Sequence, residues 1–372
     1  MTKTIITVVG ARPNFMKVGP LERQFKDFPD INHMIVHTGQ HYDDLMSGVF
    51  FDDLGLSAPA RHLGVGSGRH GEMTGKIMIE FEKVCLDIKP ELVIVVGDVN
   101  STIAAALVAR KLFIPVAHVE AGLRSFDETM PEEWNRRLTD CLSNLLYVSE
   151  PAGMKNLERE GIQMNGALLV GDIMLETLSL FLPVIKARRR WVDFGLTPRN
   201  YILVTIHRPS NVDGREALEQ VIEILESLPQ MVIFPIHPRT RKRLDEFGLK
   251  ERIDRIQNLM LVEPQSYIDF LSLLEGCSII LSDSGSVQAE ASFFDVPCLI
   301  CRENTERPVY CEQGSCRLVG RDLKLIRMSV EEAIEGRFPR STAYAKNLGK
   351  DVAKKITESI EAFLKNIDRE KV

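Results

Sequence analysis

Short apolar runs rich in β-branched residues alternate along the chain with longer stretches whose apolar positions recur three or four residues apart. The short runs show no polar–apolar alternation, which indicates strands covered by helices on both faces. The predicted strands are Ile5–Val9, His33–His37, Leu92–Val96, Pro115–Val119, Leu145–Val148, Ala167–Val170, Tyr201–Ile206, Met231–Ile236, Ser278–Leu281 and Pro297–Ile300. The segment 72–88 predicts an amphipathic helix with one apolar face, formed by Met73, Ile77, Phe81, Val84 and Ile88. The whole pattern predicts an α/β protein with doubly wound, mostly parallel sheets.

The chain is long enough for two domains of ordinary size. A polar, Arg-rich segment at Lys186–Arg190 precedes a fresh strand at Tyr201. We therefore expect two Rossmann-like domains, residues 1–172 and 173–372, with an interdomain cleft. Ligands of such sheets bind beyond the carboxyl ends of the strands. A last helix, Ala343–Ile367, either closes the second domain or crosses back onto the first.

Composition narrows the possible partners. Lys and Arg total 46 and Asp and Glu total 52, for a net charge of -6, which argues against a dedicated nucleic-acid surface. The net charge does not exclude a local basic pocket for a phosphorylated small molecule. The seven cysteines are an odd number scattered along the chain, which does not indicate a disulfide framework. No apolar run approaches the ~20 residues of a membrane span. The apolar run among the first ten residues is too short for a signal peptide. We therefore expect a cytoplasmic protein without membrane contact.

One glycine motif matches the dinucleotide pattern G-x-G-x-x-G, at Gly66–Gly71. That pattern binds a dinucleotide only when it follows a strand, and the preceding segment, Ala58–Gly64, does not read as one. We interpret it as a glycine loop leading into the helix at Glu72, and we expect no dinucleotide site.

Charged residues follow the predicted strands of the first half. Arg12 stands between the first strand and a helix, where a guanidinium and helix amides can bind phosphate, although it can equally be a surface charge. Asp98 and Glu120 end successive strands, and Glu132 lies in the first turn of a helix that begins at Pro131. Each carboxylate alone fits a structural role as a cap or dipole partner. Three of them near one sheet edge suit proton transfer.

The second half offers the parts of a nucleotide-diphosphate site. His207 and His237 each end a strand and each stand near an arginine. The small residues of Asp283–Val287 separate a strand from a helix and predict an anion-binding turn. Glu290 lies about one helical turn further on, where it can accept hydrogen bonds from a ribose. The upstream segment Glu263–Phe270 supplies an amide and an aromatic ring for a base, although Phe270 alone is more often a core residue.

Seven of these motifs occur in one order that resembles a known family. They are Gly10-Ala-Arg-Pro-Asn, Gly97-Asp-Val-Asn-Ser-Thr, His118-Val-Glu-Ala-Gly-Leu-Arg-Ser, Met130-Pro-Glu-Glu-Trp-Asn-Arg, Thr205-Ile-His-Arg, Asp283-Ser-Gly-Ser-Val-Gln-Ala-Glu and Asn304-Thr-Glu-Arg-Pro. From about Thr4 to about Gly320 the chain resembles the non-hydrolysing UDP-N-acetylglucosamine 2-epimerases of bacteria and archaea. The resemblance implies the glycosyltransferase B (GT-B) fold, with UDP in the C-terminal domain and the sugar at the interdomain cleft.

The resemblance also implies roles for individual residues. The positions that match the family's catalytic residues are Asp98, Glu120, Glu132 and His207. Those that match its substrate contacts are Arg12, Lys17, Gln265, Phe270, Ser284, Gly285, Ser286, Glu290 and Arg307, with Phe270 stacking on uracil. Two residues depart from the family pattern: Ser286 replaces a usual glycine and Ala289 a usual glutamate. Residues around Gln40-His41, where some members bind a second substrate molecule for regulation, also differ, which puts that regulation in doubt.

The activity implied is inversion at C2 of the sugar through elimination of UDP, a 2-acetamidoglucal intermediate and re-addition. Neither a cofactor nor a metal is expected, because no cluster has metal-ligand spacing, and the family resemblance suggests a homodimer. The residues leave rivals open: a hydrolysing 2-epimerase that releases UDP, the same epimerisation on a modified UDP-sugar, a GT-B glycosyltransferase, or a nucleotide-sugar sensor without catalysis.

Overall fold

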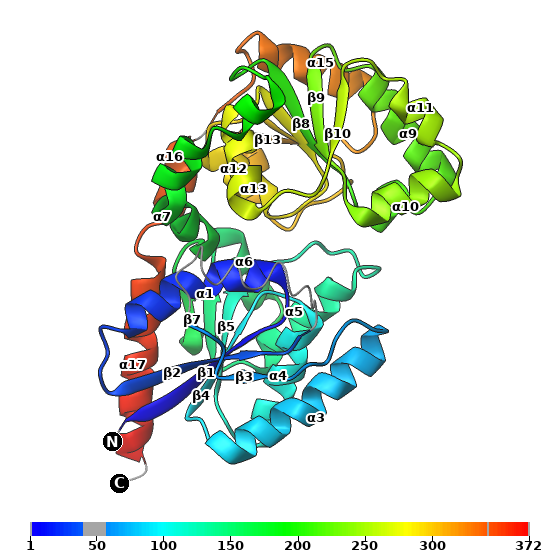
Figure 1. Ribbon diagram of the computed structural model, residues 1–372. Helices are drawn as coiled ribbons and strands as arrows, with labels where there is room; N and C mark the ends of the chain where they lie inside the picture. Colours follow the sequence, from blue (N-terminus) through cyan, green and yellow to red (C-terminus); the bar gives the residue numbers. More distant parts are fainter. Residues whose placement is uncertain (1, 40–56, 341, 371–372) are drawn as a thin grey trace. The chain divides into compact units, whose positions relative to one another are not determined.

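The computed structural model describes residues 2–39, 57–340 and 342–370. The described chain divides into unit 1, Met1–Thr177 with Leu348–Val372, and unit 2, Leu178–Asn347 (Figure 1). Each unit contains a parallel sheet with helices on both faces, which confirms the predicted α/β class with two Rossmann-like sheets. Among the described residues, no helix has the length and apolar character needed to cross a membrane.

The described part of unit 1 forms a seven-stranded parallel sheet in the order β3-β2-β1-β4-β5-β6-β7. Its strands are β1 (Lys3–Val9), β2 (Ile31–His37), β3 (Arg61–His62), β4 (Leu92–Val96), β5 (Val116–Ala121), β6 (Leu145–Val148) and β7 (Ala167–Leu169). Because β1 lies between β2 and β4, the direction of winding reverses there. The carboxyl ends of β1, β4 and β5 consequently meet at the switch point where such sheets bind ligands.

Alternate side chains of β1 enter two separate apolar cores. Ile5 and Val9 pack with α1 and α17 on one face, and Ile6 and Val8 pack with α3 and α4 on the other. The predicted apolar face of α3 is confirmed, with Met73, Ile77, Phe81 and Val84 buried. The helices of unit 1 are α1 (Arg12–Phe25), α3 (His70–Ile88), α4 (Asn100–Lys111), α5 (Pro131–Leu142), α6 (Pro151–Arg159), η1 (Met164–Gly166), the start of α7 (Ile173–Arg188) and α17 (Val352–Glu370).

The described residues of unit 2 form a six-stranded parallel sheet in the order β10-β9-β8-β11-β12-β13. Its strands are β8 (Tyr201–Thr205), β9 (Met231–Pro235), β10 (Leu259–Val262), β11 (Ile279–Ser282), β12 (Cys298–Ile300) and β13 (Cys316–Leu318). Its helices after α7 are η2 (Arg190–Phe194), α8 (Pro209–Val212), α9 (Arg215–Glu226), α10 (Pro238–Glu246), α11 (Lys250–Asp254), α12 (Tyr267–Gly276), α13 (Val287–Phe293), α14 (Pro308–Glu312), α15 (Leu323–Ile334) and α16 (Thr342–Leu348). Proline opens α5, α6, α8, α10 and α14, where its missing N–H removes no helical hydrogen bond.

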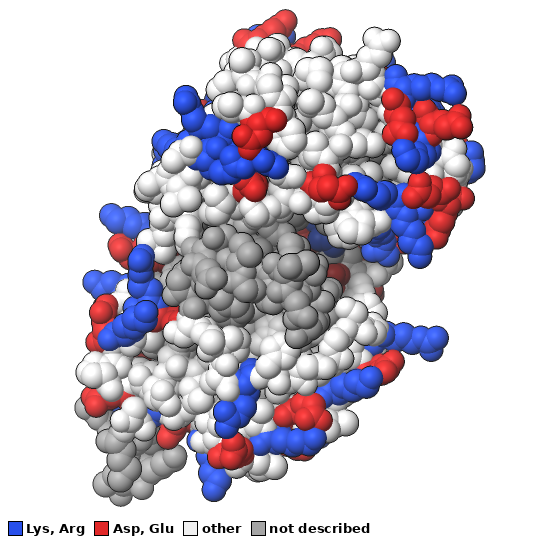
Figure 2. Space-filling model, in the orientation of Figure 1, with Lys and Arg blue, Asp and Glu red and all other residues white. Residues whose placement is uncertain are grey.

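The basic helix α10 is neutralised by carboxylates rather than left as a bare cationic surface. Arg239 and Arg243 both pair with Asp213 at 3.1 Å, and Arg241 pairs with Glu263 at 2.7 Å. Figure 2 shows the same mixture of positive and negative side chains over α9, α10 and α11.

Each predicted strand corresponds to an observed one within one or two residues at either end, and each strand that the sequence pattern missed lies at a sheet edge: β3, β10 and β13. The reading of Ala58–Gly64 as free of strand is therefore wrong at Arg61–His62, which pairs with the end of β2. The helix that follows begins at His70, slightly before the expected Glu72. The glycine motif thus follows an outermost, two-residue strand rather than the central strand of the sheet.

The prediction of one continuous last helix, Ala343–Ile367, is wrong because the chain breaks between α16 and α17. Asp351 has φ of 54°, a left-handed conformation that a helix interior does not contain. At Gly349 a side chain would lie 2.7 Å from the start of α7, so the close approach requires glycine. After the break, α17 buries Ile356 and Ile360 in the core of unit 1.

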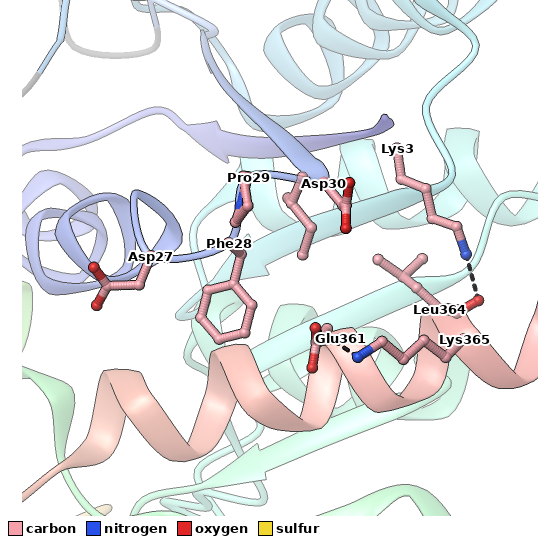
Figure 3. A pocket seen from close by; sticks show the side chains of 9 residues that line it. Lys3, Asp27, Phe28, Pro29, Asp30, Glu361, Leu364 and Lys365 are labelled. Atoms are coloured by element: carbon pink, nitrogen blue, oxygen red, sulfur yellow. Dashed lines mark hydrogen bonds and ion pairs between the residues drawn. The ribbon is translucent and has the colours of Figure 1, made fainter. Parts of the chain in front are cut away.

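A pocket of about 350 Å³ opens beside α17 (Figure 3). Lys3 donates a hydrogen bond to the Leu364 carbonyl there, and Lys365 pairs with Glu361 at 2.7 Å. Lys3 is the first residue of β1, so the pocket lies at the amino ends of the strands. Ligands of parallel sheets bind at the other edge, and we therefore do not assign substrate to this pocket.

His37, the last residue of β2, is a buried imidazole with 3% of its surface exposed. Its ring stacks on Phe15 with centroids 5.2 Å apart and shares a 2.7 Å hydrogen bond with His62. Burial, and secondarily the neighbouring His62, lowers the pKa of His37 from 6.5 to about 4. The folded protein therefore keeps this ring neutral at pH values where an unfolded chain protonates it.

We expect the free energy of unfolding to decrease as the pH falls from 6.5 to about 4, because only the unfolded chain binds a proton at His37 in that window. At pH values above 6.5, His37 is neutral in both the folded and the unfolded chain, and no stability is lost. One such group contributes about 1.4 kcal/mol per pH unit, or about 3 kcal/mol over the window. Urea unfolding at neutral pH and near pH 5 measures the loss. The loss should be smaller in His37→Gln, and equal losses in the two proteins would contradict this account.

Candidate active site

The turn between β1 and α1 is organised by one buried amide side chain. Asn14 Oδ1 accepts hydrogen bonds from the amides of Gly10 (3.0 Å) and Ala11 (2.9 Å), and its Nδ2 donates to the Val96 carbonyl (3.1 Å). The turn is thereby tied to the end of β4. A side chain at Gly10 would lie 2.0 Å from α4, so this position admits only glycine. Arg12 is the first residue of α1, and its side chain lies outside the described part of the chain.

Lys17 on α1 and Glu120 at the end of β5 form a buried ion pair, with side chains 10% and 7% exposed. Glu120 has φ of 72°, and the pairing of β5 with β6 shifts register between Val119 and Ala121. A non-glycine residue in this left-handed region costs on the order of 1–3 kcal/mol and persists only where its surroundings enforce it. The bulge and the ion pair together aim the carboxylate along the carboxyl edge of the sheet. Gly97 abuts the pair, since a side chain there would lie 2.8 Å from Lys17 Nζ.

Asp98 follows Gly97 and is held by two residues of α5. Its Oδ2 pairs with Arg136 Nη2 at 2.6 Å, and its backbone carbonyl accepts from Asn135 Nδ2 at 2.9 Å. The Arg136 side chain is 4% exposed, whereas a third of the Asp98 side chain stays exposed. Arg136 was not among the predicted site residues, although its position four residues after Glu132 on one helix was a usable signal.

Adjacent carboxylates on α5 have different surroundings. Glu133 is 1% exposed and accepts hydrogen bonds from the Ser125 hydroxyl and amide, both at 2.9 Å, and from the Phe126 amide at 3.2 Å. Glu132 is half-buried and has no hydrogen-bond or ion-pair partner within the described residues. Glu133 therefore fixes the loop before α5, and Glu132 is the carboxylate available to a ligand.

In unit 2, the turn after β8 is organised by a buried carboxylate. Asp283 accepts from the amides of His207 (2.9 Å) and Arg208 (2.8 Å) and from Asn211 Nδ2 (3.0 Å). The His207 ring stacks on His237 with centroids 5.1 Å apart. Burial lowers the pKa of His207 below 6.5, with the Arg208 charge acting in the same direction and Asp283 opposing. At neutral pH His207 is consequently a neutral imidazole, able to accept a proton.

The turn Ser284–Ser286 leads directly from Asp283 into α13. The Ser284 amide donates to the Ser282 hydroxyl at 3.0 Å, and the Ser284 and Ser286 hydroxyls lie 3.4 Å apart. Ser286 has φ of -72° and ψ of -33°, an ordinary right-handed conformation. Serine therefore replaces the family's glycine here without backbone strain. The other departure, Ala289, is 1% exposed and faces the core.

The remaining unit 2 candidates lie on α12, α13 and α14. Gln265, just before α12, accepts from Arg190 Nε at 2.9 Å and donates to the Glu263 carbonyl. Phe270 on α12 is partly exposed instead of buried in a core, and α12 packs against α13, where Glu290 is 2% exposed. Arg307 immediately precedes α14 and is 5% exposed.

The structure thus brings Lys17, Asp98, Glu120 and Glu132 to the carboxyl edge of the unit 1 sheet, and His207 beside the 284–286 turn in unit 2. Gln40 and His41 lie outside the described residues. In the ranges that the structure describes, no group of three or more His, Cys, Asp or Glu side chains has a geometry that could hold a metal ion.

Comparisons with known proteins identify similar sequences and structures. A family model described as UDP-N-acetylglucosamine 2-epimerase matches residues 23–361. A UDP-N-acetylglucosamine 2-epimerase of Methanocaldococcus jannaschii is 43% identical over 87% of this chain and 90% of its own length. A UDP-2,3-diacetamido-2,3-dideoxy-D-glucuronate 2-epimerase of Pseudomonas aeruginosa is 39% identical over 85% of this chain and 88% of its own length.

Among solved structures, the M. jannaschii UDP-GlcNAc 2-epimerase in complex with UDP-GlcNAc and UDP has a TM-score of 0.87 and 40% identity, covering 95% of this chain and 99% of that one. The UDP-N-acetylglucosamine 2-epimerase of Rickettsia bellii has a TM-score of 0.88 and 30% identity, covering 99% of each chain.

Proposed function

The chain belongs to the UDP-N-acetylglucosamine 2-epimerase family, and we propose that it interconverts UDP-N-acetylglucosamine and UDP-N-acetylmannosamine by inverting C2 of the sugar. One observation carries the proposal: two carboxylates stand at one sheet edge, each beside a buried cation. Glu120 pairs with Lys17, and Asp98 pairs with Arg136. Carboxylates held in this way are oriented for proton transfer at a bound ligand.

The chemistry of C2 requires an indirect route, because the proton there is only weakly acidic. A base removes the C2 proton, and the electron pair of the C2–H bond forms a C1–C2 double bond. The C1–O bond breaks at the same time, and the electron pair of that bond leaves with the β-phosphate of UDP. The product is a 2-acetamidoglucal. A proton then returns to C2 from the opposite face as a UDP oxygen re-forms the bond to C1. Inversion needs proton-handling groups on both faces, which we assign to Asp98, Glu120, Glu132 and the neutral His207.

We assign UDP binding to unit 2 and the chemistry at the sugar mainly to unit 1. Ser284, Gly285 and Ser286 would bind the diphosphate with hydroxyls and amides at the start of α13. Glu290 would accept from the ribose, Gln265 and the partly exposed Phe270 would contact uracil, and Arg307 would bind the substrate. Arg12 and Lys17 of unit 1 would reach the ligand from the first turn. Preorganised cations and amides of this kind stabilise a leaving diphosphate.

A second candidate is the same epimerisation on a modified UDP-sugar. The 39% identity to a relative named for a diacetamido-glucuronate favours it, since that value lies close to the 43% of the N-acetylglucosamine relative. A hydrolysing epimerase would use the same residues but release UDP and free N-acetylmannosamine. Analysis of the products distinguishes the N-acetylglucosamine epimerase, the modified-sugar epimerase and the hydrolysing epimerase.

We expect UDP-N-acetylglucosamine, incubated with the protein in heavy water, to yield UDP-N-acetylmannosamine and to acquire deuterium at C2. Elimination and re-addition exchange the C2 proton with solvent, and proton NMR measures both changes. Free UDP should stay far below the sugar nucleotides. Free UDP in amounts equal to the product would indicate hydrolysis. Exchange only with the diacetamido-uronate substrate would select the second candidate, and absence of exchange with either would contradict epimerisation.

We expect Asp98→Asn to lower kcat by ~10²–10⁴, the usual contribution of a general acid or base, while UDP binding measured by calorimetry changes little. Asparagine keeps the size of the side chain and removes the titrating carboxylate. The matched control is Asp87→Asn, which changes an exposed carboxylate paired with Arg61 at the surface. Equal activity of the two variants would contradict a catalytic role for Asp98.

We also propose that the protein acts in the cytoplasm as a homodimer. Ile79 and Leu86 are more than half exposed on α3, and Leu138 is half exposed on α5. These helices lie on either side of α4 and offer apolar surface for a second copy. Sedimentation velocity should give twice the chain mass of 42.0 kDa. A species with the mass of one chain at micromolar concentration would contradict the dimer.

A further inference from the structure

A buried polar network lies directly behind the Gly97–Asp98 turn. His118, in the middle of β5, is fully buried, and its Nε2 is 2.8 Å from the Gly97 carbonyl oxygen. Its Nδ1 is 2.7 Å from Oδ1 of Asp140, which α5 supplies and which is also fully buried. The family resemblance assigns no role to His118 or to Asp140.

Both partners of the His118 ring are hydrogen-bond acceptors. The Gly97 carbonyl can only accept. The other oxygen of Asp140 lies 2.7 Å from Arg124 Nη2 and accepts from the Gly122 amide at 3.1 Å, which is the environment of an ionised carboxylate. A neutral imidazole donates from one nitrogen and carries a lone pair on the other. That lone pair would face either a carbonyl or a carboxylate oxygen, so the contacts are satisfied only when both ring nitrogens carry protons.

Arginines complete the network on the side of Asp140 that faces away from His118. Arg124 makes a bidentate contact with Glu160, through Nε at 2.9 Å and Nη2 at 2.7 Å. The same guanidinium also contacts Asp140, so Arg124 lies between the two carboxylates. Arg137 approaches Glu160 from the rim at 3.6 Å, where that side chain is 24% exposed. Buried charges are tolerated when each has a partner of opposite sign. Glu160 has two arginine partners of its own and makes no contact with His118, so Asp140 is the carboxylate that holds the His118 ring.

Helix α5, which supplies Asp140, also holds Asp98, the residue after Gly97. Asn135 donates to the Asp98 carbonyl and Arg136 pairs with the Asp98 carboxylate. The peptide planes on both sides of Asp98 are therefore anchored, one by Asn135 and the other by His118. Gly97 itself has φ of 67° and donates its amide to the Val119 carbonyl at 3.0 Å.

We propose that His118 is a positioning residue that Asp140 and Arg124 hold as an imidazolium, and that its hydrogen bond to the Gly97 carbonyl fixes the orientation of Asp98. The proposal rests on the catalytic role proposed for Asp98, whereas the protonation of His118 does not depend on it. An imidazolium donates a stronger, charge-assisted hydrogen bond than a neutral ring, which holds the turn more rigidly.

The direct test is the ¹⁵N NMR spectrum of histidine-labelled protein at neutral pH, with the His118 ring identified by its contacts to Gly97. Both ring nitrogens should have the shifts of protonated nitrogen. A lone-pair nitrogen in the wild-type ring would overturn the proposal. This measurement needs neither a variant nor turnover.

The decisive variant is Asp140→Asn, which retains an acceptor for Nδ1 and removes the charge that holds the second proton. We expect one ring nitrogen to become a lone-pair nitrogen, the Asp98 amide signal to shift, and kcat to fall on the order of 10–100-fold with KM little changed. An unshifted Asp98 amide, or an unchanged kcat beside the altered ring, would overturn the positioning role.

The matched control is Glu160→Gln, which removes one carboxylate from Arg124 without touching His118. Its ring spectrum and kcat should equal those of the wild type, and an equal loss in both variants would show a general effect of the network on stability instead of positioning. If Asp140→Asn does not fold, His118→Gln replaces it, with a shifted Asp98 amide and lowered kcat expected. If no variant or wild type turns over UDP-sugar, the proposed function fails, while the ring nitrogens and the Asp98 amide still decide this inference.

Discussion

Both sheets depend on one kind of interaction at their carboxyl edges: a buried side-chain oxygen that accepts hydrogen bonds from two successive backbone amides. In unit 1, Asn14 accepts from Gly10 and Ala11 after β1. In unit 2, Asp283 accepts from His207 and Arg208 after β8. These amides point away from any ladder partner, and an unsatisfied buried amide is costly. The turns that carry the candidate residues keep their shape because those bonds are made.

The charges of unit 1 are arranged by depth along α5. Glu132 is partly exposed, Arg136 reaches Asp98, which is one third exposed, and Asp140 is fully buried. One helix therefore supplies a group for the ligand, a partner for a candidate catalytic carboxylate, and a charge for the interior. The effective dielectric constant falls with depth, so the buried pair of Asp140 is electrostatically stronger than the partly exposed pair of Asp98. A polar sequence such as that of α5 can therefore pack against a sheet with its buried charges, Glu133, Arg136 and Asp140, each paired.

The central strands could be predicted because burial on both faces leaves continuous apolar runs, as in β4 and β6. Of the four edge strands in the described part of the chain, β7 was predicted and β3, β10 and β13 were missed. β3 has only two residues and produces no apolar run. β10 is an apolar run of four residues, as long as β6, and differs from it in being only partly buried, which the sequence does not reveal. The break between α16 and α17 was hidden for another reason. It follows from the contact of Gly349 with α7, a residue pair far apart in sequence.

The candidate site was predictable where a residue lies at or just beyond the carboxyl end of a strand. Asp98 lies two residues after β4, and Glu120 is the second-last residue of β5. Their neighbourhood at one edge follows from parallel strands alone. Their partners were harder to find, because Arg136 is 38 residues from Asp98 and meets it only through the packing of α5. The left-handed φ of Glu120 had no signal either, since nothing in a single sequence marks a glutamate in a conformation that favours glycine.

The return of α17 to unit 1 has a consequence for the order in which the protein is made. On the ribosome, the sheet of unit 1 is synthesised first, but the helix that covers Ile5, Val9 and Leu92 on one face follows only after all of unit 2. Unit 2 is continuous and can complete its core while still tethered. The nascent sheet of unit 1 therefore presents apolar surface throughout that interval, and exposed surface of this kind favours aggregation until the covering helix arrives.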